Sequence, residues 1–118
     1  MCLAAVTPAC QCRQFRPLRD DTARLLVALR HPDQFVRIGA VARLRGRPEA
    51  EEVLLAALGD DSFLVRREAV RALEDVSRPA VRRALIGIVA EDPSRDVREQ
   101  AVAVLADFLQ RSGVSTGR

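Results

Sequence analysis

Residues 65–73 read Val-Arg-Arg-Glu-Ala-Val-Arg-Ala-Leu, and two variants of this stretch occur at residues 36–44 (VRIGAVARL) and 97–105 (VREQAVAVL). All three fit the pattern V-R-x-x-A-V-x-x-L. The first, fifth and ninth positions lie on one face of a helix, because they are four residues apart. The valine at the sixth position widens this apolar face to the ~100° stripe of a core-facing helix. The stretch therefore predicts three copies of one amphipathic helix.

A second apolar pattern precedes each copy of this stretch. It lies at residues 25–29, 54–58 and 85–89, which are rich in Leu, Ile, Val and Ala. Each unit is therefore expected to be a helix, a tight turn and a second helix. The corresponding positions Leu29, Leu58 and Val89 are 29 and 31 residues apart. A period of this size is typical of a solenoid, whose repeats bury their apolar faces by stacking on one another.

Turn residues set the expected boundaries of these units. We expect a repeat domain at residues 20–112, with units at about residues 20–45, 48–75 and 79–111. Asp33 and Ser62 are expected to cap the second helices of the first two units, because their side-chain oxygens accept from free backbone amides. Gly59 stands where a helix stop is expected. Residues 1–19 are expected to form a poorly ordered leader, and residues 113–118 a flexible tail.

Composition and charge argue against a membrane protein. The 118 residues are 48% hydrophobic and 30% charged, which is typical of one soluble globular domain. They include no run of 18 apolar residues, and the apolar start is too short for a secretory signal, so we predict no membrane segment and a cytoplasmic location.

The charge is distributed unevenly along the chain. Residues 1–48 hold nine Arg and three Asp, whereas residues 49–118 hold ten Arg and thirteen acidic residues. The basic N-terminal half is therefore a candidate for phosphate contacts.

The three cysteines, Cys2, Cys10 and Cys12, all lie in the expected leader. An odd number argues against a closed disulfide framework. Cys10 and Cys12 supply two soft ligands, whereas a structural zinc site needs four, and the only histidine, His31, lies in the first repeat. We therefore predict no metal and no cofactor. The thiols are interpreted as incidental, with metal binding and redox sensing as alternatives.

The turn pattern Asp-x-Ser-x-x-Val-Arg, followed by A-V-x-x-L, resembles the HEAT repeat family. More narrowly it is similar to the short bacterial HEAT-like repeats also found in phycobilisome lyases. The resemblance covers about residues 22–109. It implies an all-α fold, a right-handed α-solenoid of about three HEAT-like helical hairpins.

The resemblance also implies a ladder of ion pairs between neighbouring repeats, formed by the Asp five residues before the repeated Val and the Arg directly after it. We expect Arg37 to reach Asp60 and Arg66 to reach Asp92. His31 stands in place of the first Asp, and no Asp follows Arg98. The candidate ladder residues are Arg37, Arg66, Arg98, Asp60 and Asp92.

In the family, the second helices of such units line the concave side. The residues that this places in solvent are candidates for binding a partner, and they are Ile38, Arg43, Arg67, Glu68, Arg71 and Glu99. The function that we expect is a non-catalytic scaffold or adaptor that binds a protein partner on this side, because stacked helices offer a long, rigid surface.

Two other functions are weighed against this one. Nucleic-acid binding would use the basic half, through Arg37, Arg43, Arg45 and Arg47, but no aromatic residues interleave these arginines for base stacking. A lyase-like protein that holds a chromophore or cofactor is the other alternative. The sequence offers no His-based nucleophile pair, no Gly-rich phosphate loop and no catalytic residue that we can name, so we predict that the chain is not an enzyme.

The two ends of a three-repeat solenoid need cover, since three repeats are about the minimum for a stable stack. Phe15 and Leu18 could close the first repeat, and Phe108 and Leu109 the last. If they do not, end-to-end homo-oligomers are expected.

Overall fold

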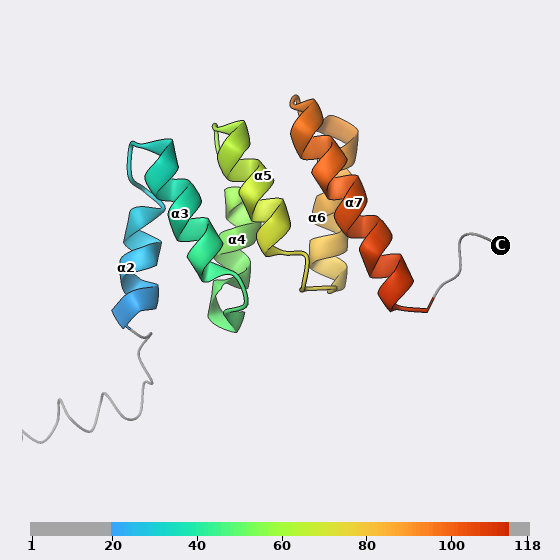
Figure 1. Ribbon diagram of the computed structural model, residues 1–118, viewed down its shortest axis with the longest axis horizontal. Helices are drawn as coiled ribbons and strands as arrows, with labels where there is room; N and C mark the ends of the chain where they lie inside the picture. Colours follow the sequence, from blue (N-terminus) through green and yellow to red (C-terminus); the bar gives the residue numbers. More distant parts are fainter. Residues whose placement is uncertain (1–19, 114–118) are drawn as a thin grey trace, which may run out of the picture.

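The computed structural model describes residues 20–113, which form three helical hairpins placed side by side (Figure 1). The described part of the chain contains no β-strand. In chain order its elements are α2 (Asp20–Ala28), α3 (Gln34–Leu44), the short 3-10 helix η1 (Pro48–Ala50), α4 (Glu51–Ala57), α5 (Phe63–Ala72), α6 (Pro79–Glu91) and α7 (Arg95–Arg111). The prediction of an all-α solenoid of helical hairpins is therefore confirmed.

Several expectations lie outside the described residues. They concern the leader at residues 1–19, the tail beyond residue 113, and the side chains of Cys2, Cys10, Cys12, Phe15 and Leu18. Within residues 20–113, no helix is long and apolar enough to cross a membrane.

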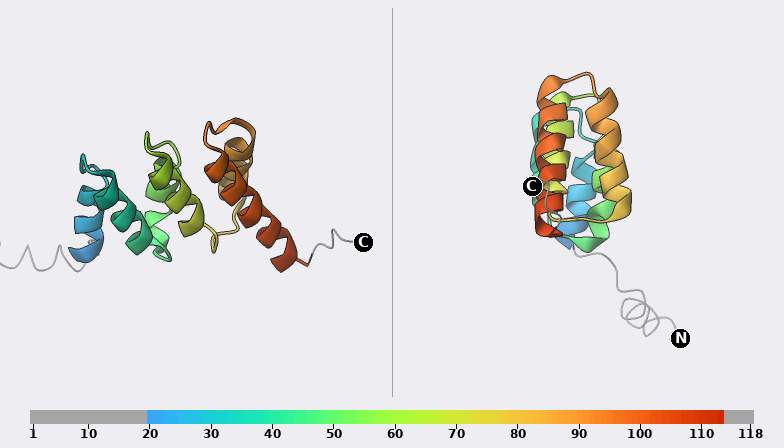
Figure 2. Two further views of the ribbon diagram at one scale, coloured as in Figure 1. Left: turned by 45° about the horizontal axis from the view of Figure 1, so that its top comes forward. Right: turned by 90° about the vertical axis from the view of Figure 1, so that its right-hand side faces the viewer.

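The helices form two layers (Figure 2). The second helices of the hairpins, α3, α5 and α7, form one layer, and the first helices, α2, α4 and α6, form the other. Neighbouring hairpins pack mainly through the second helices, since α3 packs against α5 and α5 against α7, whereas the first helices have few contacts with one another. Following the family resemblance, we call the solvent-facing side of α3, α5 and α7 the concave face.

The interior is aliphatic and runs through all three hairpins. On α5, the side chains of Val65, Ala69, Val70 and Leu73 are all 0% exposed, in keeping with the repeated pattern. Phe108 of α7, at 2% exposed, is the one aromatic side chain buried among residues 20–113. Branched and small aliphatic residues therefore fill the space between helices, as the near absence of aromatics requires.

The two ends of the stack show which side of each second helix faces which neighbour. Val65 and Val97 are 0% exposed, but Val36, at the same position of the first hairpin, is 36% exposed. The sixth position of the pattern behaves in the opposite way, because Val70 is 0% exposed and Val102, in the last hairpin, is 51% exposed. The first position therefore faces the preceding hairpin, and the sixth position faces the following one.

The turns between helices match the sequence with one exception. Asp33 caps α3, and its Oδ1 accepts a hydrogen bond of 2.8 Å from the main-chain amide two residues on. The helix stop expected at Gly59 is confirmed, because α4 ends at Ala57 and Gly59 lies in the turn that follows, although its φ is not positive. The expected side-chain cap by Ser62 is wrong, because its hydroxyl donates instead to Oε1 of Gln34 in the preceding hairpin. A contact between hairpins therefore replaces the local cap at Ser62.

The matched valines of α5 and α7 test how much the stacking contributes to stability. We expect Val70→Ala to lower the free energy of unfolding by about 2 kcal/mol, because it removes fully buried methyl groups and leaves a cavity. Val102→Ala, the same change at the same repeat position, should cost less than about 1 kcal/mol, since this side chain is half in solvent. Urea unfolding followed by circular dichroism measures both, and equal losses would contradict the assignment of the two faces.

Candidate functional site

A pair of buried side chains joins α5 to the third hairpin. Arg66 donates from Nε to Oδ2 of Asp92 (2.8 Å) and from Nη2 to Oδ1 (3.2 Å). The side chains of Arg66 and Asp92 are 12% and 3% exposed. Nη1 of Arg66 also donates to the carbonyl oxygen of Asp60, in the turn of its own hairpin (2.7 Å). One planar guanidinium therefore ties its own turn to the turn of the next hairpin.

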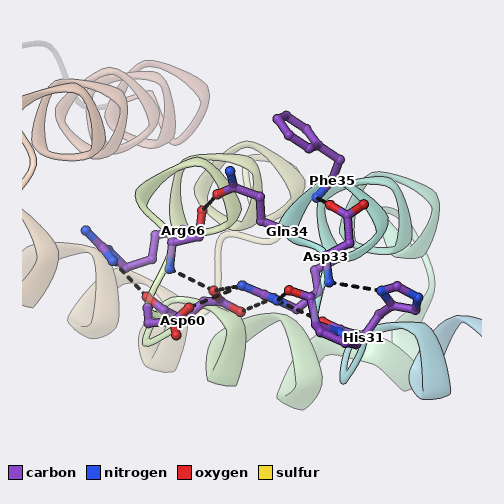
Figure 3. Close-up of polar contacts among 10 residues, drawn as sticks. His31, Asp33, Gln34, Phe35, Asp60 and Arg66 are labelled. Atoms are coloured by element: carbon purple, nitrogen blue, oxygen red, sulfur yellow. Dashed lines mark hydrogen bonds and ion pairs between the residues drawn. The ribbon is translucent and has the colours of Figure 1, made fainter.

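The first hairpin uses the same arrangement (Figure 3). Arg37 donates from Nε and Nη2 to the two carboxylate oxygens of Asp60, both at 3.1 Å. Its Nη1 donates to the carbonyl oxygen of His31 (2.8 Å). The structure thus brings Arg37 together with Asp60, and Arg66 together with Asp92.

His31 holds the repeat position of Asp60 and Asp92, and it accepts the same hydrogen bond within its turn. In the second and third hairpins, Oδ1 of Asp60 and of Asp92 accepts a hydrogen bond from the amide two residues on, at 2.9 and 2.8 Å. In the first hairpin, Nδ1 of His31 accepts from the amide of Asp33 at 3.0 Å (Figure 3). The imidazole therefore shapes the turn as the carboxylates do, but it offers no negative charge to an arginine of a preceding hairpin. This role is absent from the sequence-based interpretation.

Arg98 occupies the same position in the last hairpin. Its Nη1 donates to the carbonyl oxygen of Asp92 (2.7 Å), as Nη1 of Arg66 does to Asp60. Among residues 20–113, no carboxylate forms an ion pair with Arg98. Its guanidinium is thus anchored to its own turn and faces the end of the stack.

The pairing changes the acidity of Asp60. Burial alone raises the pKa of this carboxyl group, but the hydrogen bonds from Arg37 and from the Ser62 amide outweigh burial and hold the pKa below that of an ordinary aspartate. The ionised form is therefore favoured by folding.

Three of the candidate partner-binding residues lie on the concave face of α5. Arg67 and Glu68 are half-buried, and Arg71 is exposed. The nearest carboxylate to Arg67 is Asp96 of α7, with Nη1 and Oδ2 4.0 Å apart. Within the described part of the chain, neither Glu68 nor Arg71 forms an ion pair. This face therefore presents charges of both signs to solvent.

The other three candidates are placed differently. Ile38 of α3 and Glu99 of α7 share the repeat position of Arg67, but Ile38 packs partly against the core, and Glu99 pairs with Arg95 (2.8 Å). Arg43 corresponds to Ala72, which faces the preceding hairpin and is 1% exposed. Arg43 therefore belongs to the N-terminal end of the stack and lies apart from the group on α5.

Two exposed aromatic side chains near the concave face are absent from the sequence-based interpretation. Phe35 is 65% exposed at the start of α3, and Phe63 is 41% exposed at the start of α5. Figure 3 shows Phe35 pointing away from the ion pairs. Phe63 borders a shallow groove of about 370 Å³ between the N-terminal ends of α5 and α7. Phe35 directly precedes the repeated Val, and counting along the helix from that Val would have placed it in solvent.

An open hollow of about 550 Å³ lies between α2 and α4. Its lining is mostly apolar, and the lining residues are Leu26, Leu29, Arg30, Glu52, Val53, Ala56, Ala57 and Asp60. Within residues 20–113, no group of three His, Cys, Asp or Glu side chains is placed to hold a metal ion.

Comparison with known proteins agrees with this architecture. The family model described as HEAT repeats matches residues 22–106. No curated protein and no solved structure matches the chain significantly. The match is to HEAT repeats in general, and the narrower resemblance to the repeats of phycobilisome lyases stays a prediction.

The stability of the ion pair between hairpins can be measured with a matched pair of variants. Arg66→Met and Arg98→Met each remove one hydrogen bond to a turn carbonyl, but only Arg66→Met also leaves Asp92 buried without its cation. We expect Arg66→Met to cost roughly 2 to 4 kcal/mol more in the free energy of unfolding, because an unpaired buried charge is strongly destabilising. Thermal and urea unfolding measure the difference, and a value near zero would show that the pair contributes nothing.

The lowered pKa of Asp60 predicts a loss of stability in acid. A carboxyl group with a depressed pKa stabilises the fold above its unfolded pKa, near 3.9, and this contribution disappears as pH falls through the lower folded value. We therefore expect the stability difference between the unsubstituted chain and Asp60→Asn to be largest at neutral pH and to shrink below about pH 4. Urea unfolding over a pH series tests this, and a difference that does not change with pH contradicts it.

Proposed function

The chain belongs to the HEAT repeat family, and from this premise we propose that it is a non-catalytic scaffold that binds a protein partner on its concave face. HEAT repeats commonly serve as protein-interaction scaffolds, because a stack of hairpins holds a long surface rigid at little entropic cost to the complex.

The observation that carries the proposal is the group of Arg67, Glu68 and Arg71 on α5. These charges stand on one exposed helical face, and neither Glu68 nor Arg71 is engaged by another charged side chain among the described residues. Arginine and aromatic side chains are frequent among the residues that dominate binding energy at protein interfaces. Phe35 and Phe63, at 65% and 41% exposed, add such side chains at the rim of the same face. Mixed charge next to exposed aromatics suits a protein surface.

The distribution of arginine contacts disfavours nucleic acid as the partner. Of the four arginines that were candidates for phosphate contacts, Arg37 pairs with Asp60 and Asp61, Arg45 pairs with Glu74 and Asp75, and Arg47 pairs with Asp21. Arg43 alone of these four forms no ion pair within residues 20–113. The positive charge that the sequence concentrates at residues 37–47 is therefore largely balanced, and little of it is free to replace the counterions of a phosphate backbone.

Charge reversal on two helical layers tests the proposal. The full chain is immobilised, and the proteins that it retains from a lysate of the source cell are quantified by mass spectrometry. We expect Arg67→Glu/Arg71→Glu to lose specific partners at least tenfold, because both cations lie on the concave face.

The control is Arg24→Glu/Arg83→Glu, which makes the same change of charge at two exposed positions on the first helices. This variant should retain the partners, and circular dichroism should show that both variants are folded. Equal retention by all three proteins, or equal loss in both variants, would contradict binding on the concave face.

A further inference from the structure

Every second helix carries the same three-residue stripe on the side that faces the following hairpin. The stripe is Arg, Val and Leu at relative positions i, i+4 and i+7, so the three side chains share one helical face. On α5 it consists of Arg66, Val70 and Leu73. Arg66 is paired with the next hairpin, and Val70 and Leu73 are 0% exposed. On α3, Arg37 is likewise paired, and Val41 and Leu44 are likewise 0% exposed.

On α7 the same stripe is uncovered. It consists of Arg98, Val102 and Leu105. Arg98 forms no ion pair within residues 20–113, Val102 is 51% exposed, and Leu105 is half-buried. Leu109, one turn further along, is 45% exposed. Figure 1 shows α7 at the end of the described stack, with no further helix beyond it.

The first-helix layer shows the same difference. Ile86 of α6 holds the repeat position of Leu26 and Leu55. The two leucines are half-buried against the core, whereas Ile86 is 57% exposed. We call Ile86, Arg98, Val102, Leu105 and Leu109 the C-terminal face. Val102, Leu105 and Leu109 follow Arg98 at helical spacing on one side of α7, and Arg98 forms no ion pair within residues 20–113. A row of apolar side chains of this kind differs from isolated apolar residues on a surface.

The interior of the stack shows what covers such a face. Against the stripe of α5 lie Asp92 of the following turn and the side chains of Val97 and Val104, which are 0% and 3% exposed. Against the stripe of α3 lie Asp60 and the equivalent Val65 and Ala72, at 0% and 1%. In both cases the cover is a helical hairpin with an aspartate in its turn and small apolar residues at two positions of its second helix.

We propose that the C-terminal face binds a helical hairpin of a partner protein that carries an aspartate in its interhelical turn and small apolar residues on the facing side of its second helix. The aspartate pairs with Arg98, and the apolar residues cover Val102 and Leu105. The contact continues the two interfaces already present inside the chain, in the same register.

A second copy of this chain does not supply these groups at its own N-terminal end. Where the cover needs an aspartate, the copy offers His31, whose Nδ1 already accepts from the amide of Asp33. Where the cover needs a small apolar residue, at the position of Ala72 and Val104, the copy offers the exposed Arg43. His31 would then face Arg98 without a negative charge, and Arg43 would stand where Val102 and Leu105 need a small apolar cover. The N-terminal end of the described stack therefore lacks both groups that the interior cover supplies, and the proposed occupant is a partner protein.

This binding surface is separate from the concave face, so it does not rest on the scaffold function proposed above. The concave face lies along the sides of α3, α5 and α7, whereas the C-terminal face is the end of the stack beyond α6 and α7. Charge reversal of Arg67 and Arg71 should leave binding at the C-terminal face unchanged, and the two proposals can fail independently.

The full chain itself provides a probe of defined chemistry. The double substitution His31→Asp/Arg43→Ala gives its N-terminal end the aspartate and the small residue of an interior hairpin. A carboxylate at position 31 can accept from the Asp33 amide as Asp60 does from Ser62, so the turn should fold. Adding Val102→Asp to this probe blocks its own C-terminal face and prevents chains of probe molecules.

The probe is mixed with the unsubstituted full chain, and the mass of the complex is measured by analytical ultracentrifugation, with affinity measured by calorimetry. We expect a 1:1 complex. When the full chain that is mixed with the probe carries Arg98→Met, binding should be at least tenfold weaker, because the aspartate of the probe is left without its cation. A matched probe with Val102→Asp alone, which retains His31 and Arg43, should not bind.

Circular dichroism establishes that each protein is folded. A second probe carries His31→Asp and Val102→Asp but retains Arg43, and it should bind more weakly than the probe that also carries Arg43→Ala. The absence of a complex between folded partners overturns the proposal. Equal binding by the probe that retains His31 and Arg43, or equal binding by the Arg98→Met partner, overturns it as well, because association would then be independent of the chemistry described.

Discussion

No hairpin of this chain can bury its apolar surface by itself, and this constraint determines the rest of the structure. Each second helix has apolar side chains that face its own first helix, the preceding hairpin and the following hairpin. Val65 and Val70 on α5 are both 0% exposed only because there is a hairpin on either side. At the two ends of the stack formed by residues 20–113, the same positions are exposed, as at Val36 and Val102. The contacts between repeats therefore contribute to the free energy of unfolding as well as the contacts within each repeat.

The arginine and aspartate pairs set the position of each hairpin along its neighbour. Aliphatic side chains alone would allow a hairpin to slide along its neighbour at modest cost, whereas the guanidinium of Arg66 meets both oxygens of Asp92 and a carbonyl of its own turn in one geometry. A buried ion pair contributes little net stability compared with apolar packing, but a mispaired one is costly. We infer that the pairs fix the alignment of the hairpins, while the aliphatic interior supplies the stability.

Much of this architecture is readable from the sequence because both determinants are periodic. The repeated V-R-x-x-A-V-x-x-L gives the apolar stripe, and the resemblance to HEAT repeats implies the pairs Arg37 with Asp60 and Arg66 with Asp92, which the structure brings together. The role of His31 is not readable in this way, because an imidazole that replaces a carboxylate in a turn follows from hydrogen-bond geometry. Nor is the exposure of Val102, since a repeat pattern does not say which repeat lacks a neighbour. Arg43 shares this difficulty. Its place on a second helix suggested the concave face, but its repeat position faces a preceding hairpin, and in the first repeat this places it at the N-terminal end of the described stack.

Hydrogen exchange of the backbone amides, resolved by residue under native conditions, measures the dependence of each hairpin on its neighbours most directly. If the hairpins are stable only through stacking, the amides of α5, which has a neighbour on both sides, should be the most protected, with protection falling toward α2 at one end and α6 at the other. Equal protection in all three hairpins, or the strongest protection at an end of the stack, would show that each hairpin is stable by itself and would contradict the central role of the contacts between repeats.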